Sequence, residues 1–263
     1  MTAPVVAAVR AGAMGTLYLV PAPLDFGCAT QAELHVSVPQ GTLQTAATLQ
    51  HWVCENAKST RAYLKRVNAL YPLCVPVQDM HLQELPREVH KKGDHQAGFD
   101  ARYLLQAALQ GADVGLVSEA GMPAVADPGA SVVRAAHALG IRVVPLVGPV
   151  SLLLALAASG LSGQSFAFVG YIPIAADERA KKIKELEGLA LKTGQTQIMI
   201  ETPYRNTALL QTLLQTLQPS TRLATASGLT LPQASIHSAP AKQWKQEGWA
   251  LDNASPCVFM LGR

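Results

Sequence analysis

The chain has 263 residues, enough for two domains of about 100 to 150 residues, each with its own hydrophobic core. A composition of 49% hydrophobic and 5% aromatic residues excludes a largely disordered protein and favours an interior built from Ala, Leu and Val. The net charge of +3 does not indicate an extended nucleic-acid surface, although it permits a polyanionic substrate.

Cysteine spacing and hydropathy bear on two further classes of protein. Cys28, Cys54, Cys74 and Cys257 lie far apart without a CxxC pair, which predicts reduced, partly buried thiols rather than a zinc site or a dithiol pair. The first residues lack a basic segment ahead of their apolar stretch, and the longest later apolar run, residues 150–158, is too short to cross a bilayer. We therefore expect a cytoplasmic protein without a metal.

The first hundred residues contain strand and helix signals in turn. The sequence GTLYLV, at residues 15–20, predicts a first central strand that is stopped by Pro21. The elements expected after it are a helix over 43–49, a strand over 52–54 and a helix over 60–70 capped by Ser59. The polar, proline-punctuated residues 72–98 are expected to be the least regular segment.

The next part alternates between helix and strand. A helix over 99–110 should end at Gly111, and a strand follows over 114–117. A helix over 132–139 should end at Gly140, before a strand over 141–146. This alternation predicts a parallel sheet.

Two of these strands run into loops rich in glycine and proline. The first loop holds Gly121, Pro123, Pro128 and Gly129, and the second is VGPVS at residues 147–151. Ligands of parallel sheets bind beyond the carboxyl ends of the strands, where loop backbone and free helix amides can meet them. We expect the loops to form two walls of one cleft, although they could simply join elements. Neither matches GxGxxG or GxxxxGK[ST], so the ligand is not expected to be held by its phosphates.

From residue 150 onward the pattern changes and predicts a second domain with an antiparallel or mixed sheet. Residues 179–184, RAKKIK, are interpreted as a solvated helix face, with an RNA-binding patch as the alternative. The elements expected are a helix of small residues after 150, a strand over 166–169, a helix over 177–191, a strand over 197–200, a helix over 207–217, a strand over 222–226, a hairpin over 227–240 and a final strand over 257–261.

Five segments together carry a family resemblance: GTLYLVPAPL, VGLVSEAGMPAVADPG, GIRVVPLVGPVSLLLALAASGL, FAFVGYIP and ETPYRN. In this order they resemble the tetrapyrrole methylase superfamily, the class III S-adenosylmethionine-dependent methyltransferases. The likeness extends from about Gly15 to Leu261 and is greatest to the bacterial enzymes that methylate ribose 2′-hydroxyls of small-subunit ribosomal RNA. The resemblance implies two α/β domains, residues 1–147 and 148–263, each with a mixed sheet of about five strands flanked by helices. It also implies S-adenosylmethionine in a cleft between the domains, and a homodimer.

The resemblance further implies which residues meet the cofactor. They lie in the loop after the first strand, in the two loops described above, and on strands of the second domain that line the cleft and enclose the adenine. These residues are Pro23, Gly121, Met122, Pro123, Val125, Val150, Ser151, Leu152, Ile200, Ala226, Ser227 and Pro256.

Departures from the ribosomal RNA pattern fall where a substrate would bind. PLDF stands at residues 23–26 in place of proline-isoleucine-glycine-asparagine, and Glu119 replaces an aspartate. Transfer to a hydroxyl benefits from a base, and the carboxylates on cleft-side loops that could take the proton are Asp25, Glu55, Glu119 and Asp127, of which Glu119 is favoured. Asp25, Glu55, Asp127 and Arg205 are candidate substrate residues. The alternatives are that Asp127 caps the following helix and that Glu201 and Arg205 form a surface ion pair.

The function expected is methyl transfer to RNA, most plausibly ribosomal RNA. Methyl transfer to a small molecule is one alternative. The other is a regulatory protein that binds S-adenosylmethionine without catalysis, because the departures cluster at the substrate positions.

Overall fold

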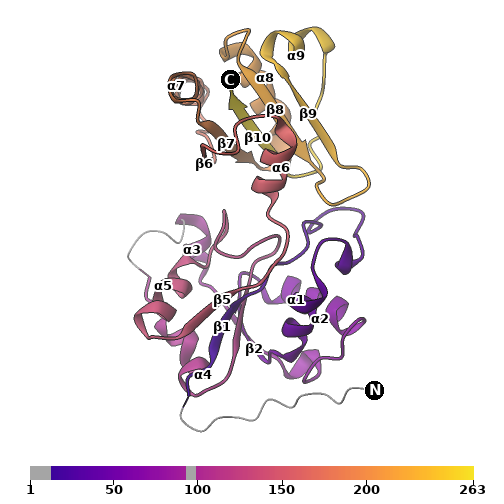
Figure 1. The fold of residues 1–263 in the computed structure, drawn as a ribbon, viewed down its shortest axis with the longest axis vertical. Coiled ribbons are helices and arrows are strands. Elements are labelled where there is room, and N and C mark those ends of the chain that lie inside the picture. Colours follow the sequence, from indigo (N-terminus) through magenta and orange to yellow (C-terminus); the bar gives the residue numbers. More distant parts are fainter. Residues whose placement is uncertain (1–12, 93–98) are drawn as a thin grey trace. The chain divides into compact units, whose positions relative to one another are not determined.

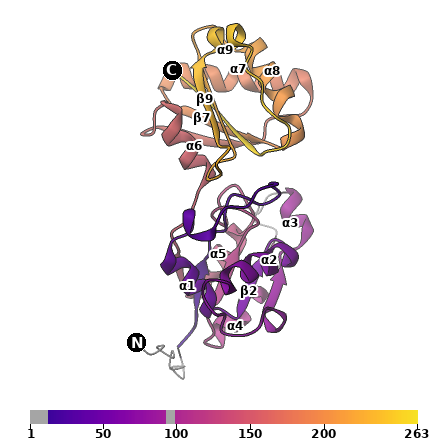
Figure 2. The same cartoon turned by 90° about the vertical axis from the view of Figure 1, so that its right-hand side faces the viewer.

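The computed structural model describes residues 13–92 and 99–263 and divides the chain into two compact units (Figures 1 and 2). Unit 1 contains the described residues up to Pro23 together with Glu33–Pro149. Unit 2 contains Val150–Arg263 and also Leu24–Ala32, the segment that follows the first strand.

Unit 1 is built on a five-stranded sheet with the order β3-β2-β4-β1-β5. All four strand pairings are parallel, as the alternation of helices and strands predicts, so the carboxyl ends of the strands share one edge. The strands are β1 (Thr16–Leu19), β2 (His51–Cys54), β3 (His81–Glu84), β4 (Val114–Val117) and β5 (Arg142–Pro145).

Alternate residues of these strands enter two cores on opposite faces of the sheet. Trp52 and Cys54 of β2 pack into the core with α1 and α2, whereas Val53 packs into the core with α4 and α5. Gly115 pairs with Trp52 in the sheet, and a Cβ atom at Gly115 would lie 2.6 Å from the indole ring. The helices of unit 1 are α1 (Gln40–Thr48), α2 (Ala57–Asn68), α3 (Arg87–Lys92), α4 (Gln106–Leu109) and α5 (Ala130–Ala138), with short 3₁₀ turns η1 (Leu34–Val36), η2 (Val77–Asp79) and η3 (Arg102–Leu105).

Three local features of unit 1 differ in detail from the expectations. The cap of α2 is Asn56, whose Oδ1 accepts hydrogen bonds from the backbone N–H groups of Lys58 at 2.9 Å and Ser59 at 3.2 Å. The segment expected to be the least regular contains two short elements, β3 and α3, within its described residues. The helix expected from residue 99 begins at Arg102 and starts as a 3₁₀ turn, η3, before continuing as α4.

Unit 2 is built on a mixed five-stranded sheet with the order β6-β7-β10-β8-β9. The pair β6–β7 is parallel, and the other three pairs are antiparallel. The last strand, β10, therefore lies in the centre of the sheet. The strands are β6 (Phe166–Gly170), β7 (Thr196–Glu201), β8 (Arg222–Ser227), β9 (Ser235–Pro240) and β10 (Cys257–Gly262).

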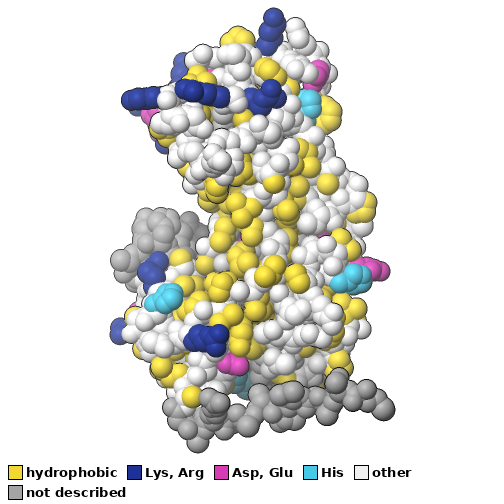
Figure 3. All heavy atoms as spheres, in the orientation of Figure 1, with side chains coloured by type: hydrophobic (Ala, Val, Ile, Leu, Met, Phe, Trp, Pro, Cys, Tyr) yellow, Lys and Arg dark blue, Asp and Glu magenta, His cyan; other side chains and the backbone are white. Residues whose placement is uncertain are grey.

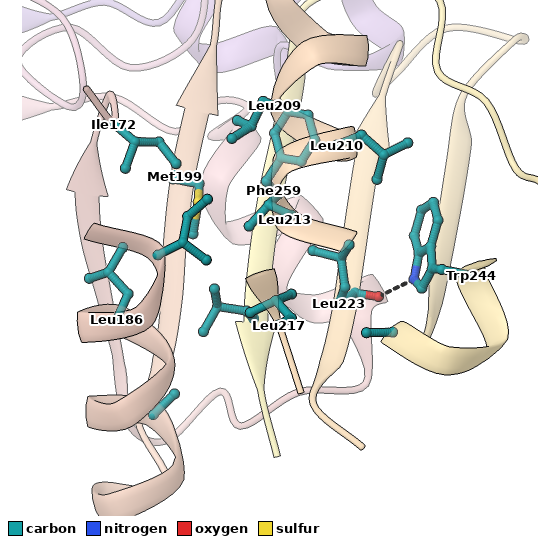
Figure 4. Packing of buried hydrophobic residues seen from close by; sticks show 14 of the residues in the cluster. Ile172, Leu186, Met199, Leu209, Leu210, Leu213, Leu217, Leu223, Trp244 and Phe259 are labelled. Atoms are coloured by element: carbon teal, nitrogen blue, oxygen red, sulfur yellow. Dashed lines mark hydrogen bonds between the residues drawn. The ribbon is translucent and has the colours of Figure 1, made fainter. Parts of the chain in front are cut away.

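The helices of unit 2 cover both faces of this sheet. Met199 and Phe259 contribute to a core with α7 (Ala176–Thr193), α8 (Asn206–Thr216) and α9 (Ala241–Glu247), in which Trp244 Nε1 donates a hydrogen bond of 2.8 Å to the Leu223 carbonyl (Figure 4). Ile198 and Val258, on the other face, pack against α6 (Ser151–Ser159). The predicted fold class, two α/β domains with five-stranded sheets flanked by helices, is confirmed.

Candidate active site

The loop after β4, residues 118–129, has an unusual backbone conformation. Gly121, Ala124, Ala126 and Gly129 have φ angles of +71°, +65°, +65° and +135°. This region disfavours side chains with a Cβ atom, so the two alanines store strain of the kind found at functional sites. Gly121 anchors the loop by exchanging backbone hydrogen bonds of 2.9 and 3.0 Å with Ala22, in the loop after β1.

The loops after β1 and β5 also approach each other closely in unit 1. A Cβ atom at Gly148 would lie 2.2 Å from Cγ of Pro21, so only glycine permits this contact. Thr42 of α1 holds the second loop by donating a hydrogen bond of 2.7 Å to the Val147 carbonyl. Three loops thus lie at the carboxyl edge of the parallel sheet.

Three of the predicted carboxylates also come together at this edge. Glu55 follows β2 and Glu119 follows the adjacent strand β4, and the Glu119 N–H donates a hydrogen bond of 3.3 Å to Glu55 Oε2. Burial, together with the negative charges of Glu55 and Glu119, raises the pKa of Asp127 to about 7. The edge therefore carries a carboxyl group that can gain or lose a proton near neutral pH.

Asp127 does not cap helix α5. Gly129, two residues after Asp127, occupies the N-cap position of this helix. Asp25 lies in the part of the chain assigned to unit 2, where it is 3% exposed and its Oδ2 accepts a hydrogen bond of 3.1 Å from the Ala32 N–H. Asp25 thus belongs to a local turn, whereas Asp127 belongs to the carboxylate cluster.

The predicted cofactor residues fall into both units. Pro23, Gly121, Met122, Pro123 and Val125 belong to unit 1, where Gly121 and Pro123 are buried and Val125 is 41% exposed. In unit 2, helix α6 begins at Ser151 after Val150 without a side-chain cap. Around it, Val150, Leu152, Ile200 and Ala226 pack in one apolar cluster, while Ser227 ends β8 and the exposed Pro256 precedes β10.

The residues of unit 1 fit a ligand that is recognised by backbone groups and carries positive charge. The strained loop presents its backbone beside the carboxylates, and Ser118 Oγ is buried without a hydrogen-bond partner among the described residues. S-adenosylmethionine has a positively charged sulfonium and polar groups that such a loop can bind.

Glu201 and Arg205 form an ion pair, as expected, but the pair is not on the open surface. The Glu201 side chain is 2% exposed, and its Oε1 accepts hydrogen bonds from Arg205 Nε at 2.8 Å, Arg205 Nη2 at 2.6 Å and the Thr202 N–H at 2.7 Å. Tyr204 is 70% exposed, and its ring centroid lies 5.4 Å from Arg205 Cζ. Sequence reasoning missed Tyr204, for which the only signal was an aromatic residue in a Pro-Tyr-Arg turn.

Two further properties hold for the residues that the structure describes. Among them, no helix is both long and apolar enough to span a membrane. The same residues contain no group of three or more His, Cys, Asp or Glu side chains that could hold a metal ion.

The fold and the site together define an α/β protein with glycine- and proline-rich loops at the carboxyl ends of parallel strands. A family model of the Tetrapyrrole (Corrin/Porphyrin) Methylases matches residues 42–244. The chain therefore belongs to this family.

Several relatives are named ribosomal RNA small subunit methyltransferase I. That of Vibrio cholerae is 31% identical over 225 residues, which are 85% of this chain and 68% of the relative. That of Escherichia coli is 34% identical over 157 residues, 59% of this chain and 54% of the relative. That of Bacillus subtilis is 31% identical over 192 residues, 73% of this chain and 56% of the relative. The chain thus matches between 54% and 68% of the length of these relatives.

Solved structures show the same fold at low sequence identity. The methyltransferase CobJ has a TM-score of 0.54 at 18% identity, covering 95% of this chain and 94% of that one. The native form of uroporphyrin III C-methyltransferase from Thermus thermophilus has a TM-score of 0.50 at 17% identity, covering 95% and 98%. Methyltransferases of this family use S-adenosylmethionine, so the family, the class of enzyme and the cofactor inferred from the motifs are confirmed.

Proposed function

We propose that this chain transfers a methyl group from S-adenosylmethionine to a ribose hydroxyl of small-subunit ribosomal RNA. The names of the relatives support the substrate class. The observation that carries the proposal is the cluster of Glu55, Glu119 and Asp127 at the carboxyl edge of the unit 1 sheet. A hydroxyl acceptor, unlike a more nucleophilic nitrogen, needs a nearby group that can take its proton.

The cofactor, when bound, supplies an electrophilic methyl group. We propose that residues 121–125 hold it from unit 1 and that Val150, Ser151 and Leu152 hold it from unit 2, in a cleft between domains of residues 1–147 and 148–263. Ile200, Ala226, Ser227, Pro256 and Pro23 complete the proposed cofactor set. The strained backbone of the loop after β4 supports this assignment, because it is an arrangement that a fold maintains for a function.

The base we propose is Asp127, with Glu119 and Glu55 in supporting roles. The carboxylates of Glu55 and Glu119 help to keep the pKa of Asp127 near 7, so its carboxylate holds a proton more readily than an ordinary aspartate does. In the ionised form, an oxygen of Asp127 would accept the proton of the ribose hydroxyl as the hydroxyl oxygen attacks the methyl group. This assignment replaces Glu119, the base expected from the sequence, with the carboxyl whose pKa is raised to about 7. Asp25 and Arg205 remain proposed substrate contacts.

The experiment that tests the proposal is transfer of a radiolabelled methyl group from S-adenosylmethionine to small ribosomal subunits from cells that lack the protein. Asp127→Asn should lower kcat at least 100-fold with little change in cofactor affinity, and Glu119→Gln should lower it less. Asp79→Asn, a change at an exposed aspartate of unit 1, is the matched control. Transfer only to small molecules, or to no acceptor, would overturn the proposal of an RNA substrate.

We also propose that the protein acts in the cytoplasm as a homodimer. Exposed apolar side chains of unit 2 support the dimer: Phe166 and Phe168 on the edge strand β6 are 42% and 38% exposed, and Leu153 and Leu154 of α6 are 49% and 40% exposed. Hydrophobic side chains are visible on unit 2 in Figure 3. Light scattering during size-exclusion chromatography measures the mass, and a monomer at micromolar concentration would contradict the dimer.

A further inference from the structure

Two exposed tyrosines follow neighbouring parallel strands of unit 2. Tyr171 comes directly after β6 and is 58% exposed, and Tyr204 comes three residues after β7 and is 70% exposed. Because β6 and β7 are adjacent and parallel, their carboxyl ends lie at one edge of the sheet. Both tyrosines therefore lie at the same edge of the sheet.

An arginine beside one of these rings is held in a defined position. Arg205 Nε and Nη2 both donate to Oε1 of Glu201, whose carboxylate is almost fully buried and cannot move away with the arginine. Arg205 Nη1 makes no hydrogen bond within the part of the chain that the structure describes. The guanidinium thus lies beside the Tyr204 ring with one nitrogen still able to donate, as in sites that recognise phosphates or base edges.

A second arginine lies close to this edge in the chain. Helix α7 begins at Ala176, five residues after Tyr171, and Arg179 is in its first turn. Arg179 Nε is buried and has no hydrogen-bond partner among the described residues. Asp177 and Glu178 are the carboxylates of the same turn, whereas Lys181, Lys182 and Lys184 follow along the helix. Figure 3 shows Lys and Arg side chains over the part of unit 2 that carries α7.

We propose that Tyr171, Tyr204 and Arg205 form a binding surface for unpaired nucleotides of an RNA substrate. Bases stack on the two tyrosine rings, Arg205 Nη1 donates to a base edge or a phosphate, and Arg179 pairs with a neighbouring phosphate. Aromatic rings beside arginines are the means by which proteins hold unstacked bases, whereas paired RNA hides its base faces. The inference deepens the proposed function, on which its substrate class rests.

The test measures binding of a fluorescent single-stranded RNA of 12 nucleotides to the full chain by anisotropy. Tyr204→Ala should raise Kd about tenfold, since stacking of one base on an aromatic ring contributes about 1–3 kcal/mol. Tyr204→Phe keeps the ring and should bind like the wild type. Tyr103→Ala, at a tyrosine of unit 1 that is 52% exposed, is the matched control and should also leave Kd unchanged.

Two results would overturn the binding surface: unchanged Kd for both Tyr204→Ala and Tyr171→Ala, or equal weakening by Tyr204→Phe and Tyr204→Ala. Thermal unfolding and S-adenosylmethionine binding of each variant exclude a general loss of structure. The proposed function fails separately, because it requires the wild type to transfer methyl groups to RNA. If Tyr204→Ala transfers methyl groups to RNA as well as the wild type does, the binding surface is rejected and the proposed function stands. If the wild type transfers no methyl group but Tyr204→Ala still weakens RNA binding, the proposed reaction is rejected and the binding surface stands.

Discussion

Asp127 is a carboxyl group whose pKa is raised to about 7 by burial and by the charges of Glu55 and Glu119. Sequence reasoning placed it on a cleft-side loop but could not rank it above Glu119, because the ranking depends on burial and on the charges that two other segments bring near it. Glu55 arrives from β2 and Glu119 from β4, strands that are adjacent only because the fold inserts β4 between β2 and β1. The raised pKa of Asp127 therefore depends on the order of the strands, which brings Glu55 and Glu119 close to it.

The raised pKa of Asp127 makes stability depend on pH. The folded pKa of about 7 exceeds the unfolded value of about 4, so protonation stabilises the native state below pH 4 and this contribution is lost as the pH rises to about 7. Asp127→Asn should abolish that fall and be more stable than the wild type at pH 8 by about 1–2 kcal/mol, less than the full linkage because the side chain is not fully buried.

Urea unfolding at pH 5 and pH 8 measures this effect. Asp79→Asn, at an exposed position, should keep the wild-type dependence. If the free energy of unfolding changes equally with pH in the wild type and in Asp127→Asn, the Asp127 carboxyl ionises like an ordinary aspartate.

Gly115 offers a second test at the residue scale. Because a Cβ atom there would lie 2.6 Å from the buried Trp52 ring, Gly115→Ala should destabilise unit 1 by about 1–3 kcal/mol through overpacking. Gly41→Ala is the control, since nothing lies within 4 Å of its Cβ position. Gly41 is in α1, where alanine should be neutral or stabilising by up to about 1 kcal/mol. Chemical denaturation of both variants gives the comparison, and equal stabilities would contradict the packing described.

At the scale of elements, helix α2 begins at a different residue from the one that the sequence predicts. Ser59 and Asn56 are both good capping residues, and the apolar periodicity alone does not decide between them. The structure assigns the cap to Asn56, so the helix begins one turn earlier and directly after Glu55, which follows β2.

Asn56→Ala should therefore cost about 1 kcal/mol of stability by leaving two backbone N–H groups without their acceptor. Ser59→Ala should cost only a few tenths of that, because the Ser59 hydroxyl merely donates to the Asn56 carbonyl. Differential scanning calorimetry distinguishes the two. A larger loss for Ser59→Ala would restore the cap expected from the sequence.

Strand β3 shows why some elements escape sequence reasoning. Its residues, His81–Glu84, are mostly polar and exposed, because the strand lies at the edge of the sheet and contributes little to the core. Periodicity reports burial, so a strand that is stabilised mainly by backbone pairing with β2 leaves almost no pattern. The buried strand β4, in contrast, was predicted with the bounds that the structure shows.

At the scale of the whole molecule, the proposed cofactor residues are divided between the two units. The proposal predicts that a change in either unit abolishes binding. Ser151→Trp at the start of α6 and Gly121→Val in the loop after β4 should each reduce S-adenosylmethionine affinity at least 100-fold while leaving the fold intact. Valine is strained at the φ of +71° that Gly121 adopts.

Isothermal titration with S-adenosylmethionine and S-adenosylhomocysteine measures this, with ATP and NAD as negative controls. Ala158→Trp, on an exposed position of the same helix α6, should bind the cofactor like the wild type. Unchanged binding in both Ser151→Trp and Gly121→Val would show that the cofactor residues are assigned wrongly.

The sequence by itself determined the family, the two five-stranded α/β domains and the loops after β1, β4 and β5, because glycine, proline and buried-strand patterns are local signals. Tertiary structure alone decided that β10 lies in the centre of its sheet, that Ala124 and Ala126 adopt positive φ angles, and that Glu55, Glu119 and Asp127 share one edge. These features depend on residues far apart in the chain. Strand order and charge proximity arise only when the chain folds, so no single segment encodes them.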